Sequence, residues 1–269
     1  MPIFRNIVLM SDADNTLLAR DHQIPRRNLE AVRCFVQEGG VFVLATGRPI
    51  HGARHIAEQL PQGMPAVYFN GALIFDHASG KPIHMDPLPP DMEKVASYLV
   101  RNYPQLGVEC FGLESSWILQ DGPYTQFHFR LLREEPRYLP ADIFPQEGLL
   151  KMFATGESED LEKARQELLT HWPGMFHTIR SGENYLEIFS RNSSKGAAVH
   201  TLRDYYQGER KIAAVGDSFN DISMLKAADM AFMPADGEQS LREIARAVCP
   251  CSQGSIADVL QILGRETSS

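Results

Sequence analysis

The chain has 269 residues, of which 43% are hydrophobic and 22% are charged, and its 34 acidic and 26 basic side chains give a formal net charge of -8. This composition holds too much apolar material for a disordered chain, and no stretch approaches the roughly 18 apolar residues that a membrane helix requires. The acidic balance disfavours a nucleic-acid partner, because phosphate backbones are bound by clustered Lys and Arg side chains. We therefore expect no membrane and no nucleic-acid partner.

The length exceeds the range of about 100 to 200 residues that is typical of one domain, which favours a core with an inserted module. The apolar run Ile7 to Met10 is too short for the core of a signal peptide, so we expect a cytoplasmic protein. Sparse cysteines in such a chain are expected to be free thiols: Cys34, Cys110, Cys249 and Cys251. The sequence makes no prediction of oligomeric state.

The first part of the chain predicts alternating buried strands and helices. Residues 6–11 form a near-continuous apolar run that ends in carboxylates, which is typical of a strand buried on both faces of a parallel sheet. Pro25 opens a helical segment that ends at Gly39-Gly40. Further buried strands are predicted at 41–45 and 66–70, the latter followed by a tight turn at Asn70-Gly71. This alternation indicates βαβ units.

The pattern changes near Lys81, where Pro82, Pro87, Pro89 and Pro90 precede a helical pattern around 92–100. Strand-like runs are predicted at 117–119 and 127–131, and an amphipathic helix at 159–171. These elements indicate an α+β module.

The parallel-sheet pattern then returns, with a strand at 211–215, a helix at about 220–227 and a strand at 230–233. We therefore expect an α/β fold with a Rossmann-like parallel sheet core formed by residues 1–83 and 190–269. An inserted α+β module is expected at residues 84–189.

Two carboxylates, Asp12 and Asp14, stand two positions apart at the end of the first predicted strand. The period of a strand would point them roughly the same way, and like charges that close resist ionising together unless a cation neutralises them. Mg²⁺, which prefers oxygen ligands, is the economical explanation. The alternative is a strand end carrying solvated Asp side chains.

The same design recurs at Asp217 and Asp221, which follow the strand at 211–215. Ligands of open α/β sheets bind beyond the carboxyl ends of the strands, so both acidic pairs are expected to converge on one site. Asp221 could instead be an acid at a helix N-terminus, favoured by the helix dipole.

Two further segments have the features of phosphate binding. Thr46-Gly47-Arg48 follows a strand and offers a hydroxyl and backbone N–H groups. Lys195 stands at the start of a predicted helix, where its charge could hold a phosphoryl oxygen. A solvated surface lysine is the alternative.

Together, in this order and spacing, the four segments resemble the haloacid dehalogenase superfamily, and most closely its Cof-like phosphatase branch with a large α/β (C2-type) cap. The resemblance extends from Ile7 to about Leu260 and includes the segments Phe69-Asn70-Gly71-Ala72 and Glu187-Ile188. It implies a Mg²⁺-dependent phosphatase that hydrolyses small phosphomonoesters. It also implies that residues 84–189 are a cap domain that sets the substrate specificity. Sugar phosphates are the first expectation, with flavin mononucleotide and pyridoxal phosphate as further candidates.

The resemblance also implies roles for single residues. Asp12 would be the nucleophile that forms an aspartyl phosphate, and Asp14 the general acid and base. Four residues would hold the phosphoryl group: Thr46, Gly47, Lys195 and Asn220. The metal would be bound by Asp12, Asp217, Asp221 and Asp14, the last through its backbone carbonyl. Substrate contacts are expected from Arg48, Asn70, Gly71, Arg180 and Tyr185.

The chain departs from the family pattern at three places. Asn15 replaces the usual Gly after the second Asp, although Asn tolerates the left-handed backbone better than most residues. Pro234-Ala235 stands where the branch has Asn before Ala. Ser252-Gln253-Gly254 replaces a late acidic pair before Gly.

Two alternatives stay open at this stage. A phosphohexose mutase of the same fold would use the same nucleophile. A non-catalytic sugar-phosphate sensor would keep the fold without turnover, because a fold alone does not guarantee activity. The partner in each case is a small phosphorylated metabolite.

Overall fold

The computed structural model of the protein describes residues 2–140, 143–145, 148–250 and 254–267. These residues form two compact units. The first, here called the core unit, comprises Met1–Gly47, Arg54–His84 and Ser194–Ser269. The second, here called the inserted unit, comprises Arg48–Ala53 and Met85–Ser193.

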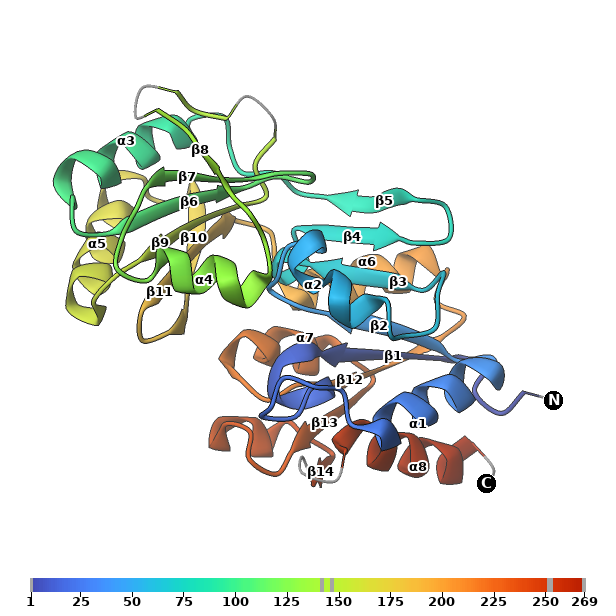
Figure 1. Cartoon of the computed structure of the whole chain (residues 1–269). Coiled ribbons are helices and arrows are strands. Elements are labelled where there is room, and N and C mark those ends of the chain that lie inside the picture. The colour runs from blue at the N-terminus through green and yellow to red at the C-terminus, as the bar shows by residue number, and fades with distance from the viewer. Residues whose placement is uncertain (1, 141–142, 146–147, 251–253, 268–269) are drawn as a thin grey trace. The chain divides into compact units, whose positions relative to one another are not determined.

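The core unit is built on an eight-stranded sheet with the order β14-β13-β12-β1-β2-β3-β4-β5 (Figure 1). The bounds in that order are Ala247–Cys249, Met230–Pro234, Lys211–Val215, Ile7–Asp12, Val41–Ala45, Pro65–Tyr68, Leu73–Asp76 and Lys81–Met85. The first six of these strands are parallel, whereas β4 is antiparallel to β3. The α/β fold with a parallel sheet core is therefore confirmed.

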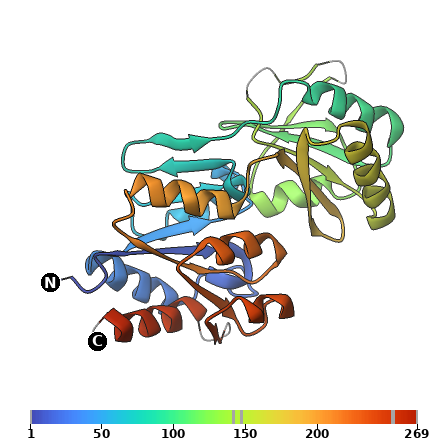
Figure 2. The ribbon, with the colours of Figure 1, turned by 180° about the vertical axis from the view of Figure 1, so that it is seen from behind.

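Helices cover both faces of this sheet. Helices α1 (Arg26–Gln37) and α8 (Ser255–Thr267) lie side by side on one face in Figure 1, and α6 (Lys195–Tyr205) and α7 (Ile222–Ala227) lie on the opposite face, seen in Figure 2. Helix α2 (Ile50–Ala57) begins in the inserted unit and ends in the core unit. Strands β1 and β2 are buried along their whole length, as their apolar runs predict.

The register of the central strands determines where the chemistry lies. Ser11 pairs with Val215, and Asp12 pairs with Ala45. The residues that follow these strands, Asp217 after β12 and Thr46 after β2, therefore leave the sheet at the same edge as Asp12. This is the edge at which ligands bind in open parallel sheets.

Short turns follow three of these strands: η1 (Ala13–Leu17), η2 (Phe69–Gly71) and η3 (Phe219–Asp221). A fourth turn, η4 (Gln239–Glu243), lies between β13 and β14. Asn15 in η1 has a φ of 57°, so it adopts the left-handed backbone expected of a residue that replaces Gly. Pro234 is the last residue of β13. Ser252, Gln253 and Cys251 lie outside the described residues.

The inserted unit is an α+β module around a six-stranded sheet with the order β10-β11-β9-β6-β7-β8. The bounds in that order are Phe176–Gly182, Tyr185–Ser190, Lys151–Thr155, Gly107–Phe111, Ser116–Gln120 and Arg137–Tyr138. Helices α3 (Met92–Asn102) and α5 (Ser158–His171) pack on one face through Val95, Leu99 and Leu161, and α4 (Thr125–Leu132) lies on the other (Figure 1).

One sequence expectation in this unit is wrong. The alternation of aromatic and polar residues at 127–131 predicts a strand, but these residues lie in the helix α4. The buried positions are Thr125, His128, Phe129 and Leu132, which have helical spacing, whereas Phe127 and Leu131 are exposed. The alternation of Phe127, Phe129 and Leu131 is accidental, because two of these three residues face solvent.

Of the described cysteines, Cys34, Cys110 and Cys249 are free thiols, as expected. Within the residues that were searched, no helix is both long enough and apolar enough to cross a membrane.

Candidate active site

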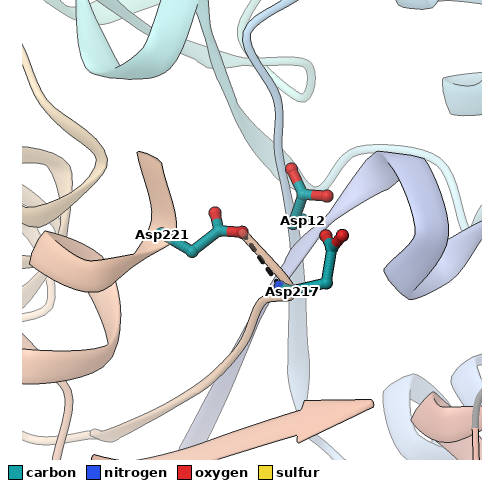
Figure 3. A group of neighbouring side chains, drawn as sticks. All are labelled: Asp12, Asp217 and Asp221. Atoms are coloured by element: carbon teal, nitrogen blue, oxygen red, sulfur yellow. Dashed lines mark hydrogen bonds between the residues drawn. The ribbon is translucent and has the colours of Figure 1, made fainter. Parts of the chain in front are cut away.

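Three carboxylates gather at the carboxyl edge of the core sheet (Figure 3). Asp12 ends β1, Asp217 follows β12 through Gly216, and Asp221 ends the turn η3. One carboxylate oxygen from each lies within 4.8 Å of the other two. Both acidic pairs of the sequence thus contribute to one site. Asp217 and Asp221 both contribute their carboxylates, whereas the pair of Asp12 and Asp14 contributes the carboxylate of Asp12.

Lys195 is the counter-charge of this cluster. Its Nζ donates hydrogen bonds to Oδ1 of Asp12 at 2.5 Å and to Oδ1 of Asp221 at 2.6 Å. The residue is 1% exposed, so it is not the solvated lysine that isolated sequence statistics favour. Helix α6 begins at this residue because the side chain of Ser194 accepts the backbone N–H of Ala197 as an N-cap.

The turn η3 fixes the position of Asp221. Its Oδ2 accepts the backbone N–H groups of Asp217 at 3.0 Å and Ser218 at 3.2 Å, and Ser218 in turn accepts the N–H of Asp221 in a capping box. A Cβ atom on Gly216 would lie 2.5 Å from Cγ of Asp221, so only Gly allows this approach. Asp221 is therefore both a helix-terminal acid and a partner of Lys195.

The charges of the cluster are unbalanced. Burial, reinforced by the proximity of Asp221 and Asp217, raises the pKa of Asp12 well above its usual value, although Lys195 opposes the shift. Burial and the neighbouring Asp221 raise the pKa of Asp217 to about 6. Burial alone would lower the pKa of Lys195, but Asp12 and Asp221 together raise it. Three carboxylates share one ammonium group, which leaves a surplus of negative charge.

A divalent cation fits this donor set. Magnesium takes oxygen ligands at about 2.1 Å in octahedral geometry and commonly uses one or two carboxylates, with phosphate and water completing its shell. The three oxygens within 4.8 Å are hard ligands of the right kind, and a cation would offset the surplus negative charge. Thr16 donates its hydroxyl to Oδ1 of Asp217 at 3.0 Å, which orients that carboxylate.

The carboxylate of Asp14 is not a member of the cluster of Asp12, Asp217 and Asp221. Its carboxylate is 42% exposed and its Oδ1 lies 3.7 Å from Nδ1 of His22. The backbone at Asp14 (φ -76°, ψ 132°) is extended within η1, and the charge of Asp14 is one of the causes that raise the pKa of Asp12. A partly exposed carboxylate can exchange protons with solvent.

The expected phosphate-binding residues of the core unit form a second group. The backbone N–H of Asn70 donates to the carbonyl of Thr46 at 3.0 Å, and Nδ2 of Asn220 donates to Oδ1 of Asn70 at 3.1 Å. A Cβ atom on Gly47 would lie 3.0 Å from Nδ2 of Asn70, so the Asn70 amide packs against the glycine. Gly71 approaches the carbonyl of Ser194 so closely that its Cβ would lie at 2.2 Å.

The other expected substrate contacts belong to the inserted unit. Arg180 donates to the carbonyl and hydroxyl of Ser158 and to the carbonyl of Glu183, which ties β10 to the start of α5. Tyr185 lies beside Phe153, with ring centroids 5.4 Å apart. Arg48 lies in the same unit, where its charge is one of the causes that lower the pKa of His128.

Sequence reasoning missed a buried polar group on the face of the inserted sheet that carries α4. Glu109 and His128 share a hydrogen bond of 2.6 Å between Oε2 and Nδ1, and Nζ of Lys151 lies 3.2 Å from Oε2 of Glu187. His128 stacks on Phe153 with ring centroids 4.2 Å apart. The only sequence signal was that Glu109 and Lys151 interrupt apolar strands.

Comparisons with known proteins show which family the chain resembles. The model of the haloacid dehalogenase-like hydrolase family matches residues 9–260. Phosphatase YwpJ of Bacillus subtilis is 27% identical over 265 residues, covering 88% of this chain and 92% of the relative. The 5-amino-6-(5-phospho-D-ribitylamino)uracil phosphatase YitU of Bacillus subtilis is 23% identical, covering 87% of this chain and 88% of the relative.

The fold also has solved counterparts. The crystal structure of a haloacid dehalogenase-like hydrolase from Bacteroides thetaiotaomicron superposes with a TM-score of 0.87 at 22% identity, over 95% of this chain and 98% of the other. The family model spans most of the sequence, including every strand end that carries a carboxylate of the cluster. The chain belongs to the haloacid dehalogenase-like hydrolase family.

Proposed function

We propose that the protein is a Mg²⁺-dependent phosphatase that hydrolyses small phosphomonoesters through an aspartyl-phosphate intermediate. The observation that carries this proposal is the buried cluster in which Lys195 bridges Asp12 and Asp221, with Asp217 beside them. The cluster places a carboxylate that can act as the nucleophile, the ammonium group of Lys195 and surplus oxygen ligands at one edge of the sheet. Phosphoryl transfer requires mainly such positioning and charge neutralisation.

Asp12 is the proposed nucleophile. Its carboxylate oxygen would form a bond to phosphorus while the bond from phosphorus to the leaving oxygen breaks. Burial favours the neutral acid, and the ammonium of Lys195 at 2.5 Å opposes this by stabilising the ionised form that attack requires. Lys195 therefore serves the nucleophile as well as the phosphoryl oxygens.

Asp14 is the proposed acid and base. It would give its proton to the leaving oxygen in the first step. In the second step it would take a proton from water, whose oxygen bonds to phosphorus as the bond to Asp12 breaks and inorganic phosphate forms. Its partial exposure suits a group that must exchange a proton between the steps.

Asp12, Asp217, Asp221 and the backbone carbonyl of Asp14 are the proposed holders of Mg²⁺. When bound, the ion would neutralise charge on the phosphoryl oxygens and orient them. Thr46, Gly47 and Asn220 would complete the phosphate site. Lys195 alone cannot balance three carboxylates and an incoming phosphate ester.

Sugar phosphates and related polyol phosphates are the proposed substrate class. The substrate in the name of the relative YitU carries its phosphate on a ribityl group, which is a sugar-alcohol chain. We propose that residues 84–189 form the cap that selects the leaving group, with Arg48, Arg180 and Tyr185 as candidate contacts. Flavin mononucleotide and pyridoxal phosphate belong in the same test panel.

The test is inorganic phosphate release from sugar phosphates, nucleotides and phosphorylated cofactors, with Mg²⁺ and with chelator. We expect metal-dependent release that falls below about one thousandth in the Asp12→Asn variant, because the nucleophile is lost. The matched control is Asp204→Asn, which changes an exposed carboxylate on α6.

Three results would count against the proposal. Wild-type rates in Asp12→Asn would exclude the covalent mechanism. Turnover that depends on a sugar bisphosphate without net phosphate release would establish a mutase. Ligand binding without turnover across the panel would indicate a sensor.

A further inference from the structure

The segment Phe69–Gly71, which follows β3, has an unusual backbone. Phe69, Asn70 and Gly71 have φ values of 51°, 52° and 106°. Residues other than Gly rarely adopt this left-handed backbone conformation, and a bulky residue such as Phe does so least readily. Such strain persists only where the surrounding structure enforces it, and it is concentrated at functional sites.

The surroundings that enforce it are two expected phosphate-binding segments. The N–H of Asn70 is held by the carbonyl of Thr46 at 3.0 Å. On the other side, Gly71 abuts the carbonyl of Ser194, directly before Lys195. Phe69 is fully buried and anchors the turn. The strained segment therefore contacts the loop after β2 on one side and the start of α6 on the other.

The amide of Asn70 is oriented by a chain of hydrogen bonds. The hydroxyl of Ser218 accepts from the N–H of Asp221 and donates to Oδ1 of Asn220 at 2.5 Å. Asn220 must then present its Nδ2, which donates to Oδ1 of Asn70 at 3.1 Å. Asn70 is left with its Nδ2, a donor, on its other side.

That donor lacks an acceptor. Asn70 is 2% exposed, and its Nδ2 has no hydrogen-bond partner among the residues that the structure describes. A buried amide N–H without a partner is rare and costly. Nδ2 also lies against Gly47, where a Cβ atom would come within 3.0 Å, so the missing side chain of the glycine makes room for the amide.

We propose that Nδ2 of Asn70 binds an oxygen of the phosphoryl group itself, rather than the leaving group. This inference rests on the proposed function. Asn70 is hydrogen-bonded to Thr46 and Asn220 and lies against Gly47, three residues that serve the phosphate in that proposal. An anionic phosphoryl oxygen is the acceptor that an unpaired N–H binds best. An N–H₂ group cannot ligate a cation, so the unpaired atom is not a metal ligand.

The test separates the amide from the backbone strain. Asn70→Gly keeps the positive φ without strain and removes the amide. Asn70→Asp keeps the size and the tolerance of positive φ but replaces the donor with an acceptor. The matched control is Asn102→Asp, at an exposed position at the end of α3.

The readouts are the affinity for inorganic phosphate in the presence of Mg²⁺, measured by calorimetry and as product inhibition, and kcat/KM for substrates with different leaving groups. We expect both Asn70 variants to bind inorganic phosphate about 10- to 100-fold more weakly, the range for a lost hydrogen bond to a charged group. kcat/KM should fall by a similar factor for every leaving group. Mg²⁺ affinity should be unchanged.

Phosphate affinity in Asn70→Gly within twofold of wild type would overturn the inference, and so would a wild-type protein that does not bind inorganic phosphate. A loss confined to certain leaving groups would also overturn it, because the amide would then contact the leaving group. If wild type binds phosphate but hydrolyses nothing, the proposed function fails while the phosphate affinities still test Asn70. If wild type hydrolyses and the variants keep their phosphate affinity, only the Asn70 inference fails.

Discussion

The Nζ atom of Lys195 donates a hydrogen bond of 2.5 Å to Oδ1 of Asp12, although the two residues are 183 positions apart in the chain. Both are buried. Removing one member of a buried ion pair leaves the other charge without compensation, which typically costs about 3 to 5 kcal/mol. The pair thus connects the first and the last parts of the core unit and places the proposed nucleophile, Asp12, beside its counter-charge.

Asp217 is expected to destabilise the metal-free protein and to be required for the effect of Mg²⁺. Burial and Asp221 raise its pKa from 3.8 to about 6. Between these two pH values the folded protein binds the proton more tightly than the unfolded chain does, so the free energy of unfolding falls as the pH rises. At pH 7.5, Asp217→Asn should therefore stabilise the metal-free protein by about 1 to 3 kcal/mol.

The same variant should lose the stabilisation that Mg²⁺ gives to wild type, which is about 2.7 kcal/mol at a concentration 100 times the Kd. Melting temperatures with chelator and with Mg²⁺ measure both effects, and Asp204→Asn is the control. An Asp217→Asn protein that is still stabilised by Mg²⁺ as wild type is would remove Asp217 from the metal site.

Much of the core fold could be predicted from the sequence because its signals are local. Residues 6–11 and 41–45 are apolar runs buried on both faces, and each predicted a strand within one residue of β1 and β2. Gly39-Gly40 predicted the end of α1 because positive φ favours Gly, and Gly39 has a φ of 86°. The convergence of Asp12, Asp217 and Asp221 followed from the rule that places ligands beyond the strand ends.

What the sequence did not predict depends on contacts between distant residues. Nothing local distinguishes the buried Lys195 from a surface lysine, because its burial depends on Asp12 and Asp221. The helix α4 was mistaken for a strand because the alternation of apolar residues was more regular than the helical spacing of its buried positions. The pair of Glu109 and His128 joins a strand to a helix and has no spacing that a motif could capture.

Gly216→Ala should disable the site without changing a charged residue. A Cβ atom there would lie 2.5 Å from Cβ and Cγ of Asp221, which holds Lys195 and the N–H groups of Asp217 and Ser218. Overpacking at such a position typically costs about 1 to 3 kcal/mol, and the displaced carboxylate should lower kcat more than it raises KM. Steady-state kinetics and thermal unfolding measure both.

The matched control is Gly148→Ala, where the nearest atom to an added Cβ is 3.6 Å away and the contact is ordinary. It should be neutral in both measurements. Equal activities in the two alanine variants would show that Asp221 can move without harm, and the proposed rigid placement of this carboxylate would be wrong.

His128 is expected to stay neutral in the folded protein. Burial and the charge of Lys151 lower its pKa to about 3, while burial raises the pKa of its partner Glu109. An unfolded histidine binds a proton near pH 6.5, and the folded one does not do so until about pH 3. The unfolded state therefore binds more protons in this window, and the contribution of His128 to the free energy of unfolding falls as the pH falls, by up to about 1.4 kcal/mol per pH unit.

The shift of the His128 ring signals in an NMR titration measures this directly, with His128→Gln to assign them. We expect no titration of His128 between pH 8 and pH 5. We also expect the unfolding free energy of wild type to fall relative to that of His128→Gln as the pH is lowered from 7 to 5.5. A midpoint near 6.5 would show that water reaches the imidazole. The face of the inserted sheet that carries α4 would then be open to solvent, and the burial of the pair of Glu109 and His128 would be wrong.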